Sequence, residues 1–248
     1  MKTLKALLAA AIVGFGCSPF GCSPVGASDE HYAKARKRLA VEIGDYGVPI
    51  RERANPAIMR QMGTVPRHLF VPPAQRGEAY RNYPLPIGQD QTISQPSLVA
   101  LMTHLLRPEP EDVVLEVGTG SGYQAAILSG LVRKVYTIEI VGSLARQSAQ
   151  RLQQLGYRNV TVRHGDGYAG WPDHAPFDAI IVTAGADHVP MQLIEQLKPR
   201  GRMVIPVGSS RNIQQLMLIT KDSKGRIRDE TVIPVRFVPL TRDVRDPT

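Results

Sequence analysis

The sequence predicts a doubly wound α/β fold with a mostly parallel sheet and a helical N-terminal extension. From residue 108 onward, short apolar runs alternate with amphipathic helix patterns, as expected of strands joined by helical crossovers. The first of these runs, residues 113–117, leads directly into a glycine-rich turn, which is typical of sheets that bind nucleotides. With 248 residues, 43% of them hydrophobic, the chain is long enough for one large domain with its own core.

Residues 1–27 are predicted to be a leader that precedes the folded domain. Lys2 and Lys5 are followed by an apolar run over residues 6–16, and Val25-Gly26-Ala27 offers small residues where a signal peptidase cleaves. The run is about half as long as a permanent membrane span requires, so no transmembrane segment is expected. We therefore expect cleavage after Ala27 and an exported, periplasmic protein.

Two alternatives stay open for this segment. Cys17 and Cys22 each follow a glycine in a repeated Phe-Gly-Cys-Ser-Pro unit, which resembles a bacterial lipoprotein signal and would attach the chain to lipid. The segment would otherwise be an upstream extension of a cytoplasmic protein that begins near residue 30. These are the two cysteines of the sequence, too few for a disulfide framework or a zinc ribbon.

Residues 28–107 predict the helical extension. Helix patterns over residues 34–43 and 55–62 are separated by glycines and a proline. Prolines between residues 66 and 86 then mark an extended, turn-rich stretch. Residues 95–106 carry apolar side chains at helical spacing, so this helix is expected to pack through one face.

Residues 108–248 predict the sheet. The expected strands are residues 113–117, 134–140, 159–163, 177–183, 202–207, 214–220 and 232–238. The expected helices are residues 123–130, 144–155 and 190–197. Because single helices between strands require right-handed crossovers, the sheet should be mostly parallel and covered on both faces.

The glycine turn Gly118-Thr119-Gly120-Ser121-Gly122 follows the first strand, which ends in Glu116-Val117. Glycines at this place let the backbone turn sharply and approach a ligand closely. The spacing is not the dinucleotide fingerprint, because Tyr123 stands where its third glycine would be, and no lysine follows as in a P-loop. A pyrophosphate is therefore not the favoured ligand, and the triplet alone is also compatible with an ordinary tight turn.

Two further acids follow the next two strands. Glu139 ends the second strand, where a carboxylate can accept hydrogen bonds from a ribose diol. Asp166 follows the third strand beside Gly167, where it can meet an adenine amino group. For each acid alone a solvated loop carboxylate, or an Asx turn at Asp166, is the ordinary explanation. Together, the three loops indicate a nucleoside ligand without phosphates.

These motifs resemble the protein-L-isoaspartate O-methyltransferase family, whose cofactor is S-adenosyl-L-methionine. The resemblance spans residues 35–241, and Thr-Ile-Ser-Gln-Pro at residues 92–96 is particular to this family. It implies a Rossmann-like methyltransferase fold and methyl transfer to the α-carboxylate of L-isoaspartyl residues in damaged proteins and peptides, which initiates their repair. The segments that carry it are residues 65–72, 79–82, 91–96, 115–126, 135–139, 165–167, 175–178 and 237–240.

The resemblance also implies roles for single residues. Ser94 matches the family's active-site serine and would orient the attacking carboxylate. From spacing alone, Thr92 and Ser94 would instead cap the helix that follows. The cofactor-binding residues that we predict are Gln91, Thr92, Ile93, Glu116, Gly118, Thr119, Gly120, Ser121, Gly122, Glu139, Asp166 and Gly167.

Two departures from the family pattern bear on specificity. Asp90 stands where the family usually has glycine, and Ala184-Gly185 replaces its usual Ala-Ala pair. Asp90 adds a charge beside the expected acceptor cleft. Another carboxylate acceptor, or a catalytically idle S-adenosylmethionine-binding envelope protein, therefore stays open as an alternative.

The remaining features of the sequence bear on whether the protein needs a general base, a metal or a nucleic-acid partner. A peptide carboxylate titrates near pH 3–4, roughly, so this nucleophile is already ionised and needs no strong general base. The six histidines show no ligand spacing, so no metal is expected. The net charge of +8 is spread along the chain and aromatic residues make up only 6%, so nucleic acid is not an expected partner. We expect a monomer.

Overall fold

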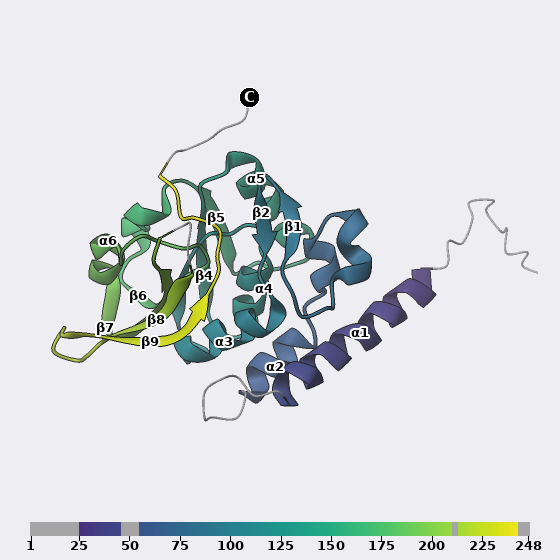
Figure 1. Ribbon diagram of the computed structural model, residues 1–248, viewed down its shortest axis with the longest axis horizontal. Coiled ribbons are helices and arrows are strands. Elements are labelled where there is room, and N and C mark those ends of the chain that lie inside the picture. Colours follow the sequence, from purple (N-terminus) through teal and green to yellow (C-terminus); the bar gives the residue numbers. More distant parts are fainter. Residues whose placement is uncertain (1–24, 46–54, 210–212, 243–248) are drawn as a thin grey trace, which may run out of the picture.

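The computed structural model describes residues 25–45, 55–209 and 213–242. Cys17, Cys22 and most of the predicted leader therefore lie outside the described residues. The described chain forms a seven-stranded sheet with helices on both faces and a separate two-stranded hairpin beside it (Figure 1). This arrangement confirms the predicted fold class. None of the described helices combines the length and apolar character that crossing a bilayer requires.

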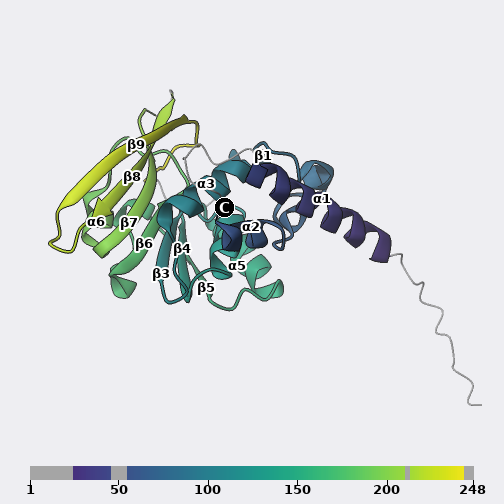
Figure 2. The ribbon, with the colours of Figure 1, turned by 90° about the horizontal axis from the view of Figure 1, so that it is seen from below.

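The first helix is longer than the sequence predicts. It spans Val25–Asp45 instead of residues 34–43, and its N-terminal end extends away from the rest of the domain (Figure 2). The apolar pattern marks the C-terminal half, where Leu39, Ala40 and Ile43 are buried. The N-terminal half contacts the domain through Tyr32, which stacks on His68 with ring centroids 4.0 Å apart. It also carries an exposed Glu30–Lys34 ion pair at 2.8 Å, which stabilises a helix without giving an apolar signal.

The rest of the N-terminal region consists of short elements, and its two-stranded hairpin was not predicted. Of the predicted helices, residues 55–62 and 95–106 are confirmed as α2 and α3. Helix α3 packs against two strands of the large sheet, so it belongs to the layer structure of the core. The elements are α2 (Pro56–Met62), the 3-10 helices η1 (Arg67–Phe70) and η2 (Pro73–Glu78), β1 (Leu85–Gly88), β2 (Gln91–Ile93) and α3 (Pro96–Leu106).

The large sheet has the strand order β5-β4-β3-β6-β7-β8-β9. Strands β5, β4, β3, β6 and β7 are parallel, and β8 and β9 are antiparallel to their neighbours. The chain runs outward from β3 to β5 and returns to β6 on the other side of β3, which creates a switch point between β3 and β6. The strands are β3 (Val113–Val117), β4 (Lys134–Glu139), β5 (Val160–His164), β6 (Phe177–Val182), β7 (Leu197–Val207), β8 (Gln214–Lys221) and β9 (Ile227–Val235).

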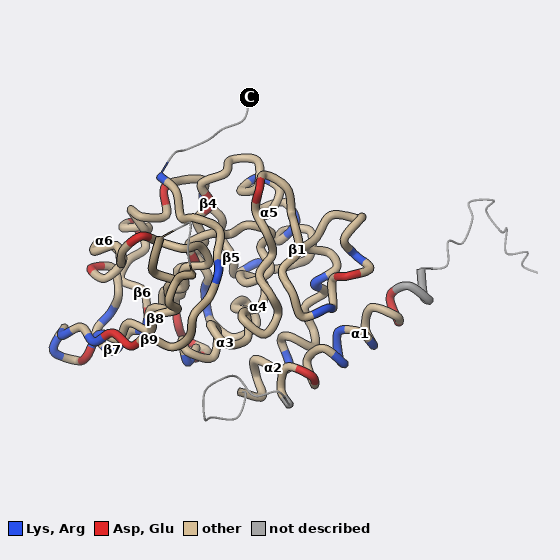
Figure 3. Tube along the Cα trace, in the orientation of Figure 1, with Lys and Arg blue, Asp and Glu red and all other residues tan. Residues whose placement is uncertain are grey.

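Three elements differ from their predicted bounds. The predicted helix over residues 190–197 is shortened to α6, Met191–Glu195, because β7 already begins at Leu197 and not at residue 202. Strand β9 begins at Ile227, before the predicted residue 232. Its first five residues are exposed and pair with β8 through the backbone, so they lack the apolar alternation on which the prediction depended. Charged residues occur along this ribbon and on α1 (Figure 3).

Two apolar clusters cover the two faces of the sheet. On one face, Val114 and Ile181 pack with α3, α4 (Tyr123–Ser129) and α5 (Gly142–Gln154). On the other face, Leu115 and Ile180 pack with α6 and the 3-10 helices η3 (Gly167–Ala169) and η4 (Pro172–His174). Neighbouring residues of one strand therefore face opposite layers, which is why these strands are continuously apolar.

Candidate active site

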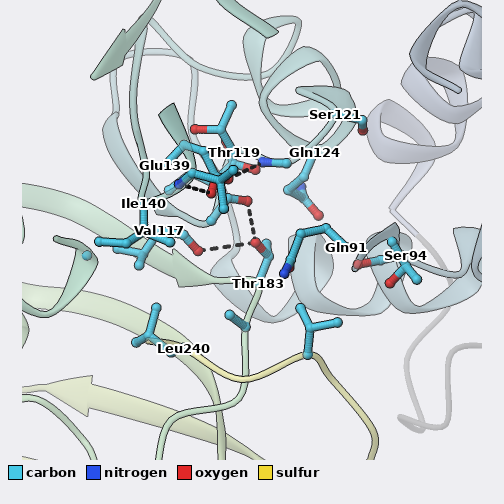
Figure 4. A pocket seen from close by; sticks show the side chains of 18 of the residues that line it. Gln91, Ser94, Val117, Thr119, Ser121, Gln124, Glu139, Ile140, Thr183 and Leu240 are labelled. Carbon is cyan, nitrogen blue, oxygen red and sulfur yellow. Dashed lines mark hydrogen bonds between the residues drawn. The ribbon is translucent and has the colours of Figure 1, made fainter. Parts of the chain in front are cut away.

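A cavity of about 570 Å³ lies at the carboxyl ends of the parallel strands, beside the switch point. Its walls come from the loops after β3, β4, β5 and β6, from the β1–β2 hairpin, and from the segment that follows β9. Figure 4 shows Glu139 and Ser94 on opposite sides of it. Of the predicted site residues, those that line it are Gln91, Thr92, Ile93, Ser94, Glu116, Gly118, Thr119, Gly120, Ser121, Glu139 and Gly167.

The glycine turn is held tightly against the end of β6. Gly118 has φ +100°, and a Cβ atom there would lie 2.5 Å from Thr183 Oγ1. The Thr183 hydroxyl donates to the Gly118 carbonyl at 2.6 Å, so any side chain at residue 118 would displace this bond. Thr183 lines the cavity but was not among the predicted site residues.

Glu139 joins the end of β4 to the glycine turn. Its Oε2 accepts from the Gly120 amide at 2.7 Å, and its Oε1 accepts from the Val141 amide at 3.0 Å. Burial raises the pKa of this carboxyl, while the two amides oppose that shift. Each carboxylate oxygen keeps a lone pair for a further donor, so the predicted ribose contact stays compatible with this geometry.

Glu116 ends a buried chain of hydrogen bonds. The Thr137 hydroxyl donates to Glu116 Oε2 at 2.6 Å, so the Thr119 hydroxyl, 2.7 Å from that of Thr137, donates to Thr137. Glu116 is fully buried, and this burial raises the pKa of its carboxyl to about 8. Its other oxygen, Oε1, has no hydrogen-bond partner in the described part of the chain.

The β1–β2 hairpin covers the glycine turn. Its two turn residues, Gln89 and Asp90, have φ +55° and +57°, as a type I′ turn requires. A Cβ atom at Gly120 would lie 3.5 Å from Ile87 Cδ1, which places the hairpin directly over the turn. Asp90 therefore occupies a position where glycine is favoured, and aspartate is among the residues that tolerate it.

Ser94 does not cap the helix that follows it. The N-cap of α3 is Gln95, whose side chain makes no capping hydrogen bond; the Ser97 amide in the first turn instead donates to Asn82 Oδ1 at 3.0 Å. Ser94 lines the first cavity and also a second cavity of about 500 Å³. The two cavities share Thr92, Ser94, Thr183 and Val238, so they meet at the hairpin.

Two predicted cofactor-binding residues are not among those that line the cavity. Asp166 Oδ1 accepts from the Tyr168 amide at 2.8 Å, which is the Asx-turn alternative and caps η3. Gly122, with φ +86°, is the N-cap of α4, and a Cβ atom there would lie 3.1 Å from Leu152. In this structure both residues shape the loops that carry their neighbours.

The segment after β9 closes the cavity and explains the second departure from the family pattern. Gln214 Oε1 accepts from the Phe237 amide at 2.8 Å, and its Nε2 donates to the Phe237 carbonyl at 3.4 Å. A Cβ atom at Gly185 would lie 2.9 Å from that Nε2, so glycine makes room for Gln214. Gly185 also exchanges backbone hydrogen bonds with Val238 and Leu240. A glycine at an expected alanine was the sequence signal for this contact.

The chain is similar to known proteins over most of its length. The profile of the protein-L-isoaspartate(D-aspartate) O-methyltransferase (PCMT) family matches residues 37–245. Protein-L-isoaspartate O-methyltransferase 2 of Syntrophobacter fumaroxidans is 56% identical over 220 residues, which cover 87% of this chain and 89% of that protein. A solved protein-L-isoaspartate O-methyltransferase superimposes with a TM-score of 0.73 at 28% identity, over 82% of this chain and 65% of that one. A Plasmodium falciparum protein proposed to be such an enzyme, solved in complex with S-adenosyl-L-homocysteine, superimposes with a TM-score of 0.72 at 25% identity. The match covers 84% of this chain and 99% of that one.

Because the carboxyl of Glu116 is buried, we predict that the stability of the ligand-free chain depends on pH. Its pKa is raised by burial from 4.5 to about 8, so between these values the folded chain holds a proton that the unfolded chain releases. This contribution to the unfolding free energy is therefore fully present below about pH 4.5 and is lost as the pH rises toward 8, at most about 1.4 kcal/mol per pH unit. The variant Glu116→Gln has no titrating carboxyl at this position, so its unfolding free energy should lack this pH-dependent contribution.

Urea unfolding between pH 5 and 8.5 measures this effect. As the pH rises, the unfolding free energy of the wild type should decrease relative to that of Glu116→Gln. Glu195→Gln, at an exposed position of α6, should follow the wild type throughout. A constant difference between Glu116→Gln and wild type across this range would contradict the prediction.

Proposed function

Because the chain belongs to the protein-L-isoaspartate O-methyltransferase family, we propose that its two joined cavities bring S-adenosyl-L-methionine and an isoaspartyl α-carboxylate together at Ser94. The enzyme is an S-adenosylmethionine-dependent methyltransferase that acts on isoaspartyl residues and so initiates protein repair. The observation that carries the assignment of the two cavities is their opposite charge.

The first cavity fits the cofactor. Of the described residues that line it, the ionisable ones are Asp90, Glu116 and Glu139, all of them acidic, and burial favours the neutral form of Glu116. Acidic walls suit a sulfonium and an ammonium group and disfavour a polyphosphate. Bound there, S-adenosylmethionine supplies a methyl group on a positively charged sulfur, which is open to attack by a carboxylate. Glu139 and the glycine turn would hold its adenosine portion.

The second cavity fits the acceptor. Arg236 is the charged side chain among the described residues that line it, and polar groups accompany it at Asn82, Gln95 and Ser97. A cation at its wall attracts a carboxylate, whereas the acids of the first cavity repel one. The acceptor is therefore expected to enter through the second cavity and to reach the cofactor where the two meet.

Ser94 orients the attacking carboxylate in this arrangement. Its hydroxyl donates a hydrogen bond to one carboxylate oxygen, which leaves the other oxygen directed toward the methyl carbon. The new bond joins this oxygen to the methyl carbon as the bond from carbon to sulfur breaks, and the electron pair stays on sulfur. Since the carboxylate is already ionised, the residues contribute positioning and exclusion of water.

Ser94→Ala should lower turnover and leave cofactor binding nearly unchanged. Loss of one hydrogen bond to a charged group corresponds to a decrease of about 10- to 100-fold in kcat. Steady-state rates with an isoaspartyl peptide and calorimetric titration with S-adenosylhomocysteine measure the two effects. Ser223→Ala, on the exposed turn between β8 and β9, is the matched control. Full turnover in Ser94→Ala would remove Ser94 from the mechanism.

Acceptor specificity separates the proposed function from its two alternatives. With labelled S-adenosylmethionine, we expect label in an isoaspartyl peptide and none in the same peptide with a normal aspartyl linkage. Label in both peptides, or in neither but in another carboxylate, would favour a different acceptor, for which Asp90 would be the first residue to vary. Cofactor binding without any transfer would favour an idle binding module.

We also propose that the protein is exported with cleavage after Ala27 and works as a monomer. The basic and apolar pattern of residues 1–27 supports export, and the cavities support a monomer because residues of one chain line both of them. N-terminal sequencing of the protein from its native cell should begin at Ser28. An intact Met1 would contradict export, and a start at a lipid-modified Cys17 or Cys22 would favour the lipoprotein alternative.

A further inference from the structure

Gln124 presents a buried, unpartnered oxygen at the cofactor cavity. It lies in the first turn of α4, directly after the glycine turn, and only 7% of it is exposed. Its Nε2 donates to Thr103 Oγ1 at 2.9 Å, and its Oε1 has no hydrogen-bond partner in the described part of the chain. Gln124 lines the first cavity but not the second, and Figure 4 shows its side chain inside the cavity, on the side toward Gln91 and Ser94.

The orientation of this amide follows from its neighbour. The Thr103 hydroxyl donates its single proton to the Val99 carbonyl at 2.7 Å, so toward Gln124 it can only accept. The amide nitrogen of Gln124 must therefore face Thr103, and the carbonyl oxygen faces away from it. A buried carbonyl oxygen without a donor is costly, so a ligand that brings a donor to this place gains affinity.

The position of Gln124 selects which donor this is. The adenosine portion of the cofactor is expected near Glu139 and Gly167, at the loops after β4 and β5. The methyl group must face Ser94, where the two cavities meet. The methionyl portion then lies between the glycine turn and the hairpin, beside Gln124, and its one group with N–H bonds is the α-ammonium.

We propose that Gln124 Oε1 accepts a hydrogen bond from the α-ammonium group of S-adenosylmethionine and so fixes the methionyl end of the cofactor. The inference rests on the proposed placement of the cofactor in the first cavity. Thr103 acts as a positioning residue, because it holds the amide in the orientation that directs the oxygen toward the ligand. Nothing in the glycine motif itself requires an amide side chain at this position.

The test compares two ligands that differ in the ammonium group alone. Calorimetry with cofactor-free enzyme measures the affinity for S-adenosylhomocysteine and for its deaminated analogue, in which hydrogen replaces the amino group. Gln124→Met keeps the length of the side chain but lacks the acceptor oxygen. We expect it to weaken S-adenosylhomocysteine binding roughly 10- to 100-fold and to leave binding of the analogue within about twofold.

Two further variants make the comparison decisive. Gln153→Met, the same change at an exposed position of α5, should bind both ligands like the wild type. Thr103→Val removes the anchor of the amide without contact to the ligand, and it should weaken S-adenosylhomocysteine more than the analogue. It also provides the test should Gln124→Met not fold.

The outcomes separate this inference from the proposed function. Unchanged S-adenosylhomocysteine affinity in Gln124→Met, or an equal loss for both ligands, would overturn the role of Gln124 while leaving the methyltransferase intact. Should Gln124→Met not fold, equal affinities for both ligands in Thr103→Val would overturn it. Failure of the wild type to bind S-adenosylhomocysteine at all would instead overturn the placement of the cofactor on which both proposals depend.

Discussion

The hydrogen bond from the Gly120 amide to Glu139 is the interaction on which the site depends. It joins the loop after β3 to the end of β4, and the Thr183 hydroxyl joins the same turn to the end of β6. Three parallel strands thus share one anchored turn, and each supplies its part of the wall from a fixed position. The glycines permit this close approach because a side chain at Gly118 would collide with Thr183.

The two cavities that this scaffold forms differ in the charge of the side chains that line them. Acidic side chains line the cavity proposed for the cationic cofactor, and an arginine lines the cavity proposed for the anionic acceptor. The Ser94 hydroxyl lies at the boundary between them. Such an arrangement requires no strong base, because the acceptor carboxylate is already negative and the sulfonium of the cofactor is already positive before methyl transfer.

The local sequence pattern predicted the helices and strands whose apolar residues recur at regular spacing. It missed the segments that are held in a sheet by backbone hydrogen bonds alone. Strands β3, β4 and β6 carry dense apolar runs and were placed within a residue or two of their bounds, whereas the exposed start of β9 gave no such signal. Eleven of the predicted site residues line the first cavity, so the fold brings them together. Thr183 and Gln124 were missed because their roles arise from contacts between distant elements.

The anchoring of Phe237 by Gln214 has a consequence for synthesis of the protein. The lining of the cavity includes the hairpin near residue 89 and the segment up to Thr241, so its wall is complete only after the segment that follows β9 has been synthesised. The parallel strands can assemble while the chain is still being translated, since domains fold progressively from the N-terminus. A chain that stops before Phe237 would keep the glycine turn and still lack one wall of the cavity. Completion of the proposed cofactor site is thereby tied to synthesis of the segment that follows β9.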